Sequence, residues 1–406
     1  MGMLLCLCSL SATAQEAWDI DRCMAYAVEH NRTVKQRKLE SDNYRLDKIE
    51  AIGQFLPGVS GSVSAQYSYG RSVDPGTNTY ISQSTFNNGY AMEGSMPIFQ
   101  GGSLINQVRR ARANELLGKA ALQEAKDNTA LETFQAYIDA LYYYGTTRLA
   151  EQKLVESDSL VYKTRRQEAL GLKGMADVAQ MEAQQATDAY NLTHQRNLYE
   201  TAMLTLKQTM NYPVADTLVL DTRLIDTPVI EQVRLSADNA DDVFRIALNC
   251  NPTLRQSEMN KQVARMNRKI SWGSLFPTIS IFGGISSSYY KELHQSGYDN
   301  FADQMKNNFG SYFGISMSIP IFNRMSGSIG VKQAKNNYLI ATQQYEAQKE
   351  ALQKLVLQAV QDREGFLKES LQMEKKVTSD SIAYRVTRRK FEEGPVSYTH
   401  LRAHET

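Results

Sequence analysis

The chain has 406 residues, of which 42% are apolar and 22% are charged, and its formal net charge is +1. This length suits two or three domains, and the composition excludes a disordered chain. The balanced charge gives no reason to expect affinity for nucleic acid or for a membrane surface. Only nine prolines occur, and none lies between Pro97 and Pro213 or between Pro320 and Pro395, which leaves room for two very long helices.

The N-terminal segment has the features of a secretory signal peptide. Residues 3–10 form a short apolar core, and Ala12-Thr13-Ala14 provides a small-x-small cleavage site, so we expect residues 1–14 to be removed. The core is shorter than the roughly 20 apolar residues that span a membrane. The sequence therefore predicts an exported protein without a membrane anchor at this end.

Removal of the signal peptide leaves two of the four cysteines. Cys6 and Cys8 would leave with it, whereas Cys23 and Cys250 remain, each near the start of one half of the chain. We expect two buried free thiols at these positions. A disulfide between them in an oxidising compartment is the alternative.

Residues 17 to about 52 form the first predicted helix, with Asp19 or Asp21 as its N-cap. After Pro57, apolar residues alternate with small polar residues from Val59 to Tyr69. This period of two predicts a strand with one apolar and one polar face.

A polar loop is expected over residues 73–89, followed by a second alternating strand from Tyr90 to Pro97. A long helix then runs from Leu104 to about Leu170, which is on the order of 100 Å at 1.5 Å per residue. A further helix is predicted from about residue 174 to 212. Coiled-coil seams are indicated by apolar residues at helical spacing, namely Leu131, Phe134, Ile138 and Leu141 on the first helix and Leu192, Tyr199, Met203, Leu206 and Met210 on the second.

The second half of the chain repeats the first. The turns that flank the strand pair and the end of the long helix return at offsets of 220 to 223 residues, too long a period for a solenoid. The sequence thus predicts repeat 1 in residues 15–212, a strand-like equatorial segment in 213–240 and repeat 2 in 241–394. The corresponding motifs are Gln54-Phe55-Leu56-Pro57 with Ser274-Leu275-Phe276-Pro277, Pro97-Ile98-Phe99 with Pro320-Ile321-Phe322, and Arg165-Arg166 with Arg388-Arg389.

Repeat 2 has the same predicted elements as repeat 1. A strand runs from Ile279 to Tyr289, a polar loop covers residues 291–308, and a second strand runs from Phe309 to Ile319. A long helix then extends from Ser326 to about Glu393. By the repeat, about forty further residues that correspond to Leu172–Tyr212 are expected after Gly394.

The final residues, 395–406, match nothing in repeat 1 and break the helical pattern. They read like a translated sequencing adapter, so we interpret them as a non-native tail. We therefore predict that the chain ends one helix early and that restoring this helix is required for stable oligomers.

The four predicted strands are 10 to 12 residues long, the length of a tilted membrane-spanning strand. Open sheet edges are not tolerated in hydrocarbon, and four strands are too few to close a barrel. Several protomers must therefore contribute strands to one barrel. We expect the serine-rich face to line water (Ser60, Ser62, Ser64, Ser286, Ser316, Ser318), and interfacial aromatic girdles to include Tyr67, Tyr69, Tyr289, Tyr290 and Tyr312.

These motifs resemble the TolC-type outer-membrane efflux channel family, or outer membrane factors, over residues 17–394. The resemblance rests on Trp18-Asp19-Ile20 through Glu29-His30-Asn31, on the strand-start turns at Pro57 and Pro277, and on the strand-end turns at Pro97 and Pro320. It implies an α+β membrane and periplasmic fold, in which two helix–strand–strand–long helix repeats give four strands per protomer. Three protomers would form a 12-stranded outer-membrane β-barrel continued by a long periplasmic α-helical barrel.

The resemblance also implies a function and partners. It predicts a passive homotrimeric duct in the outer membrane of a Gram-negative bacterium, which carries small molecules from a periplasmic adaptor and an inner-membrane pump to the outside. At the periplasmic tip, Gly171 and Asp177 match the family pattern in repeat 1 and Gly394 matches the turn of repeat 2. Phe391 stands where a tip tyrosine occurs. Asp177 as a helix cap, and Gly171 and Gly174 as turn glycines, are the alternative interpretations.

Catalytic and metal-binding signatures are not found in the sequence. His30, His194 and His294 have no metal-ligand spacing, and no nucleophile, phosphate-loop or dinucleotide motif occurs. We therefore expect neither enzyme activity nor a cofactor. Two alternatives remain open at this point: the outer channel of a type I protein-secretion system, and a periplasmic coiled-coil structural protein.

Overall fold

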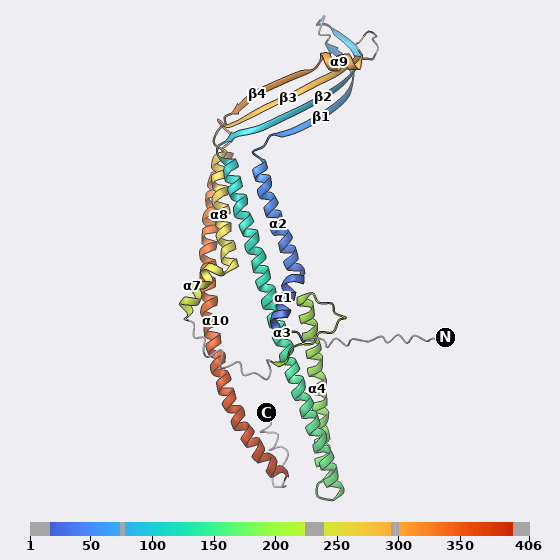
Figure 1. The fold of residues 1–406 in the computed structure, drawn as a ribbon, viewed down its shortest axis with the longest axis vertical. Coiled ribbons are helices and arrows are strands. Elements are labelled where there is room, and N and C mark those ends of the chain that lie inside the picture. Colours follow the sequence, from blue (N-terminus) through green and yellow to red (C-terminus); the bar gives the residue numbers. More distant parts are fainter. Residues whose placement is uncertain (1–16, 74–77, 224–238, 294–296, 298–299, 393–406) are drawn as a thin grey trace, which may run out of the picture. The chain divides into compact units, whose positions relative to one another are not determined.

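The structure is a computed structural model that describes residues 17–73, 78–223, 239–293, 297 and 300–392 (Figure 1). The predicted signal peptide with Cys6 and Cys8, most of the segment 213–240, Gly394 and the tail 395–406 lie outside these residues. The chain divides into two compact units that cut across both repeats. The sheet unit contains residues 40–120 and 253–348, and the helical unit contains the described parts of residues 1–39, 121–252 and 349–406.

The sheet unit contains one four-stranded antiparallel sheet in the order β1-β2-β3-β4 (Figure 1). The strands are β1 (Gly58–Val73), β2 (Tyr80–Gln100), β3 (Thr278–Glu292) and β4 (Gly310–Ser318). The hairpins of the two repeats therefore join through the pairing of β2 with β3. In this order the outer edges of β1 and β4 pair with no other described strand.

The register separates the predicted polar and apolar faces. Directly paired residues of neighbouring strands project from the same face of a sheet. One cross-strand row contains Ser60, Glu93, Gly284 and Tyr312. The six serines that were expected to line water all share this polar face, namely Ser60, Ser62, Ser64, Ser286, Ser316 and Ser318. The opposite, apolar face contains Val59, Val63, Met92, Ile281, Ile285, Phe313 and Ile315.

The strand lengths differ from the prediction. β2 has 21 residues and begins at Tyr80, so residues 80–89 of the loop predicted over 73–89 belong to a strand. Its first half is polar, with asparagine, serine and threonine in place of an apolar alternation, yet it pairs with the end of β1 as far as Val73. Pairing of its backbone with β1 makes this segment a strand, and the pattern of its own side chains does not indicate it. β4 is shorter than predicted, at 9 residues.

The loop predicted over residues 291–308 contains a short helix, α9 (Phe301–Asn307), which begins at the N-cap Asn300. Its Gln304 side chain donates to the Tyr290 carbonyl and accepts from the Tyr290 N–H, both at 2.9 Å. Asn308 donates to the Ser288 carbonyl at 2.7 Å. β4 pairs with β3 only as far as Ser286. The two side-chain amides therefore form hydrogen bonds with the backbone of β3 beyond that point, at Ser288 and Tyr290.

The first predicted helix is two helices, α1 (Ile20–His30) and α2 (Arg32–Gly53), with Asp19 as the N-cap of α1. The break falls at Asn31, whose backbone is extended. The Asn31 Oδ1 accepts from the Thr33 N–H at 2.7 Å, and its Nδ2 donates to the Thr209 carbonyl at 2.9 Å. These two side-chain hydrogen bonds compensate for the backbone hydrogen bonds that are lost where the helix is interrupted.

Repeat 2 has the same break. Helix α7 (Ala240–Cys250) ends at Asn251, which is also extended, and α8 (Pro252–Gly273) begins with the proline that favours a first helical position. Asn251 lies 220 residues after Asn31. The single long helix predicted from residue 17 to 52 is thus corrected in both repeats.

The long helices end within one residue of their predicted limits. They are α3 (Ser103–Ala169) and α10 (Ser326–Glu392), each of 67 residues, and α4 (Met175–Met210) follows α3. Both long helices contribute to both units. Before α3, Gly101 and Gly102 have positive φ angles, and Arg324 and Met325 have positive φ angles at the equivalent positions before α10. The repeat therefore preserves this backbone turn without preserving glycine.

The core of the helical unit lies where α1, α3 and α4 meet. Tyr137 is fully buried, and its hydroxyl lies 3.1 Å from the Trp18 carbonyl oxygen and 3.0 Å from that of Asp221. Leu218 and Leu220 are buried in the same cluster, so this part of the equatorial segment is packed into the core. The remaining buried members are Cys23, Ala27, Ala136, Ala140, Leu141, Ala202, Leu206 and Met210.

The predicted seam of α4 is confirmed at Leu192, Leu206 and Met210, which are buried. Three of the four residues predicted for the α3 seam are not buried within the single chain. Leu131, Phe134 and Ile138 are exposed to 66%, 43% and 38%, and only Leu141 is buried. Small residues such as Ala136 and Ala140 pack on the inner side instead, because they allow the helix backbones to approach closely.

The two remaining cysteines are free thiols with different surroundings. Cys23 is fully buried in the helical core, and burial raises the pKa of its thiol to about 12. Cys250 is exposed at the end of α7. The prediction of two buried thiols is therefore correct for Cys23 and wrong for Cys250.

Candidate functional site

The turn between α3 and α4 is built by glycine. Gly171 has a φ of 72°, and its N–H donates to the Glu168 carbonyl while the Leu172 N–H donates to that of Gln167. This pair of hydrogen bonds is a Schellman motif, which ends a helix with a left-handed residue. The interpretation of Gly171 as a turn glycine is therefore correct.

Asp177 caps the start of α4. Its Oδ2 accepts from the Gly174 N–H at 3.1 Å, and its own N–H donates to the Gly174 carbonyl at 3.0 Å. A carboxylate in the first turn also interacts favourably with the helix dipole. The side chain stays exposed, so capping leaves its charge at the surface of the hairpin. A role for Asp177 in a constriction remains a prediction.

The last turns of α10 contact α3 through a charged cluster that sequence reasoning missed. The Tyr384 hydroxyl donates to the Glu156 Oε1 at 2.9 Å, and the Arg388 Nη1 lies 3.7 Å from the same oxygen. The Tyr384 ring packs beside the buried Val161 and Met181. We call Glu156, Tyr384 and Arg388 the latch. It ties repeat 2 to repeat 1 by groups that are far apart in sequence.

The other predicted tip residues give less information. Gly394 lies outside the described residues. Phe391 is in the last turn of α10, but its side chain is outside the description. Phe391 stands where a tip tyrosine occurs in the family, and phenylalanine has no hydroxyl group to form a contact at this position. A hydroxyl contact with α3 is made seven residues earlier, about two turns along the helix, by Tyr384.

The five predicted girdle tyrosines lie on two different faces of the sheet. Tyr67, Tyr69 and Tyr289 share the apolar face, whereas Tyr290 and Tyr312 project from the polar face. Tyr67 packs on Phe86, and Phe86 contacts Tyr289, with ring centroids 4.6 and 6.2 Å apart. An aromatic girdle thus remains a prediction for the three residues of the apolar face.

The four predicted turn prolines have different positions. Pro57 and Pro277 directly precede β1 and β3, and Pro320 follows β4. Pro97 lies inside β2, so its assignment to the strand-end turn is corrected. The β2–β3 register shifts between Pro97 and Phe99. A bulge accommodates proline because proline has no N–H to donate to the ladder.

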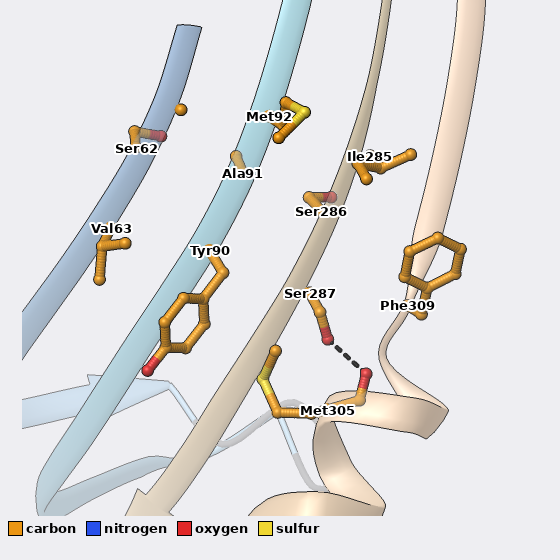
Figure 2. Close-up of a pocket in the computed structure, with 11 residues that line it drawn as sticks. Ser62, Val63, Tyr90, Ala91, Met92, Ile285, Ser286, Ser287, Met305 and Phe309 are labelled. Atoms are coloured by element: carbon orange, nitrogen blue, oxygen red, sulfur yellow. Dashed lines mark hydrogen bonds between the residues drawn. The ribbon is translucent and has the colours of Figure 1, made fainter.

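The apolar face has a hollow of about 320 Å³ beside α9, shown in Figure 2. Val63, Tyr90, Met92, Ile285 and Met305 line it, and the Ser287 hydroxyl donates to the Met305 carbonyl at 2.7 Å. The lining includes no charged side chain and is mostly apolar, although three serines and Tyr90 contribute hydroxyl groups. The hollow therefore suits hydrocarbon better than a polar ligand.

Two kinds of feature are absent from the described residues. No group of histidine, cysteine or acidic side chains there is placed to hold a metal ion. No described helix combines the length with the apolar character that a membrane span requires. The chemistry that the described residues do offer is a polar sheet face, an apolar sheet face and the charged latch.

Comparison with known proteins gives a family and a fold. The chain matches the outer membrane efflux protein family over residues 26–211 and 243–405. The second match includes residues 395–405, which the sequence analysis interpreted as a non-native tail, and the origin of this stretch stays a prediction. No curated protein matches the chain.

Solved structures with similar folds cover almost the whole chain. The crystal structure of CusC, which concerns folding and transmembrane channel formation, matches with a TM-score of 0.76 and 18% identity over 95% of this chain and 85% of that one. VceC of Vibrio cholerae matches with a TM-score of 0.76 and 13% identity over 95% and 89%. The open state of MtrE of Neisseria gonorrhoeae matches with a TM-score of 0.74 and 17% identity over 95% and 82%.

The family match covers both repeats, including the helices that carry the latch. The fold matches cover the four-stranded sheet together with the long helices. An outer-membrane location follows from the family. The chain belongs to the outer membrane efflux protein family.

Proposed function

We propose that three copies of the chain form a passive outer-membrane exit duct, which receives small molecules from a periplasmic adaptor and an inner-membrane pump. The observation that carries this proposal is the amphipathic sheet, whose two outer edges pair with no other described strand. In hydrocarbon, each unpaired backbone group costs several kcal/mol. Pairing β4 of one copy with β1 of the next satisfies both edges and closes a ring of twelve strands.

The two sheet faces then have opposite environments. The apolar face, with Ile281, Ile285 and Ile315, would meet lipid, and the hollow beside α9 would be filled by lipid chains. The serine-rich face would line a water-filled lumen. Each copy adds α3 and α10, and 67 residues of helix are on the order of 100 Å long. A tunnel of such helices supports transport across the periplasm.

The latch is the proposed gate contact. It holds the end of α10 on α3 through one carboxylate, that of Glu156, which is only about one-third exposed. Separation of the helices would break both the Tyr384 hydrogen bond and the Arg388 ion pair. A relative, MtrE, has been solved in an open state. We infer that opening in this chain separates α10 from α3 at the latch and that the pump side provides the energy, with no covalent chemistry in the duct.

The proposal is tested by assembly and transport. Chemical crosslinking of the protein extracted from outer membranes should give trimers, and the purified trimers should form conducting pores in planar lipid bilayers. Soluble monomers or dimers without pores would support a periplasmic structural protein instead. Co-expression with a matching adaptor and pump should raise resistance to small toxic compounds. Restoration of protein secretion without resistance would favour a type I secretion channel.

A further inference from the structure

The polar face of the sheet is almost free of charge. Among its described residues, only Glu93 and Glu292 carry charged side chains. Glu292 is the last residue of β3, whereas Glu93 lies well inside β2 and is paired on both sides, with Ser60 and with Gly284. Its side chain is exposed in the single chain. A lone carboxylate among uncharged side chains dominates the local electrostatic field.

The surroundings of Glu93 are built by two glycines and two aromatic rings. A Cβ at Gly284 would lie 2.8 Å from the Tyr312 hydroxyl oxygen, so the Tyr312 ring extends across the space that this glycine leaves. In the same way a Cβ at Gly314 would lie 2.7 Å from the Phe282 ring. The two rings are neighbours, with centroids 6.2 Å apart. Both rings therefore lie along the polar face of the sheet.

Tyr312 reaches towards Glu93 across Gly284. The three residues occupy one cross-strand row, and the Tyr312 side chain interacts with the Glu93 carboxylate. A larger residue than glycine at position 284 would displace the ring. This row holds the Glu93 carboxylate and the Tyr312 ring, and the Phe282 ring lies in the next row of the same face.

In the proposed trimer, symmetry repeats this row at one height of the lumen. Three Glu93 carboxylates then form a ring, and no basic side chain of the described polar face neutralises it. Rings of acidic side chains select cations in pores, and aromatic faces attract organic cations. We propose that Glu93 gives the duct a preference for cations and that Tyr312 and Phe282 provide ring faces for organic cations. This inference rests on the proposed function, because it needs a closed lumen.

The test measures ion selectivity of the purified trimer in planar bilayers under a potassium chloride gradient. The wild type should prefer potassium over chloride. Glu93→Gln keeps the shape and removes the charge, so the permeability ratio should fall by roughly tenfold, the low end of the effect of a focused charge on counter-ion concentration. Glu93→Asp should keep the preference. Glu292→Gln, on the same face but at the strand end, should change the ratio less.

A second measurement distinguishes the contribution of the aromatic rings from that of the Glu93 charge. Tyr312→Leu should leave the permeability ratio close to that of the wild type and weaken block by tetraethylammonium. Unchanged block would contradict the role of the rings. Conducting Glu93→Gln pores with the wild-type ratio would overturn the role of the charge. A wild type that forms no pores would instead contradict the exit duct, and the inference would fail with it.

Discussion

Arg165 and Arg388 occupy equivalent positions on the two long helices but form ion pairs of different kinds. Arg165 donates to Glu182 of α4 at 2.7 Å, within the covalent α3–α4 hairpin of repeat 1. Arg388 lies 3.7 Å from Glu156 and so connects repeat 2 to repeat 1. The first pair adds to a contact that the chain connection already favours. The second joins segments that are far apart in sequence, and it is the contact that the proposed gate would open.

The sheet unit shows the same divergence between repeats. In repeat 1, Lys48 pairs with Glu115 at 2.6 Å. At the equivalent positions of repeat 2, Arg268 lies over the Tyr338 ring, 5.2 Å from its centroid. Nearby, the Tyr44 ring packs on Gly118, and the corresponding pair is Ala264 and Ala341. Two alanines thus stand where repeat 1 has a tyrosine and a glycine, so the two repeats pack these helices through different side chains.

The largest expected difference between the repeats concerns the buried core. Tyr137 is fully buried, whereas its equivalent Val360 is only partly buried. Tyr137→Ala should cost about 3–5 kcal/mol, because it leaves a cavity. Val360→Ala should cost about 1 kcal/mol. Thermal unfolding of the detergent-solubilised protein, followed by circular dichroism, measures both. Equal shifts of the unfolding midpoint would contradict the assignment of the core to repeat 1.

The latch gives the next effect. Tyr384→Phe removes a hydrogen bond to a carboxylate, worth about 1.5–3 kcal/mol, and should raise the open fraction about tenfold or more. Single-channel recordings should show larger or more frequent openings. Tyr162→Phe is the matched control, since Tyr162 is 72% exposed on α3. If both variants behave like the wild type, Tyr384 does not hold a gate.

The smallest expected effect is a difference in pH dependence between the Lys48–Glu115 ion pair and the Arg268–Tyr338 cation–π contact. Hydrogen bonds from Lys48 and Lys119 lower the pKa of Glu115 to about 2 from 4.5. A lowered pKa in the folded state stabilises the protein above pH 4.5, and this contribution disappears as the pH falls through about 2. Lys48→Met should cost about 1 kcal/mol at neutral pH and progressively less towards pH 2.

Arg268→Met in repeat 2 is the control, because no carboxylate takes part in its contact with Tyr338. Its cost should not vary between pH 5 and pH 2. Unfolding midpoints across this range measure both variants. If the unfolding midpoints of the two variants changed with pH in parallel, the lowered pKa of Glu115 would not depend on Lys48.

The long helices could be predicted closely because their signals are local. The absence of proline sets their length, and the turn at Gly171 and the Pro320 turn mark where they stop or start. The alternation in β1, β3 and β4 likewise predicts which face each side chain takes. The break at Asn31 was missed, and one of the hydrogen bonds of its side chain is made to Thr209, which is 178 residues away.

Features that depend on contacts between the repeats could not be predicted. Nothing local to Tyr384 indicates that Glu156 is its partner, because 228 residues separate them. The exposed positions Leu131, Phe134 and Ile138 follow a heptad spacing, yet the chain packs the neighbouring small residues inward. Periodicity identifies an apolar stripe but not its partner. The first half of β2 was missed because its pairing partner, rather than its own composition, makes it a strand.

The amide cap of β3 has a consequence for how this protein changes over generations. Gln304 and Asn308 close a strand edge with side chains and therefore impose no alignment on the residues around them. The connection between β3 and β4 can lengthen, shorten or acquire new residues while the ladder below Ser286 keeps its pairing. We therefore expect insertions and substitutions in this connection to be tolerated where they leave Gln304 and Asn308 in place.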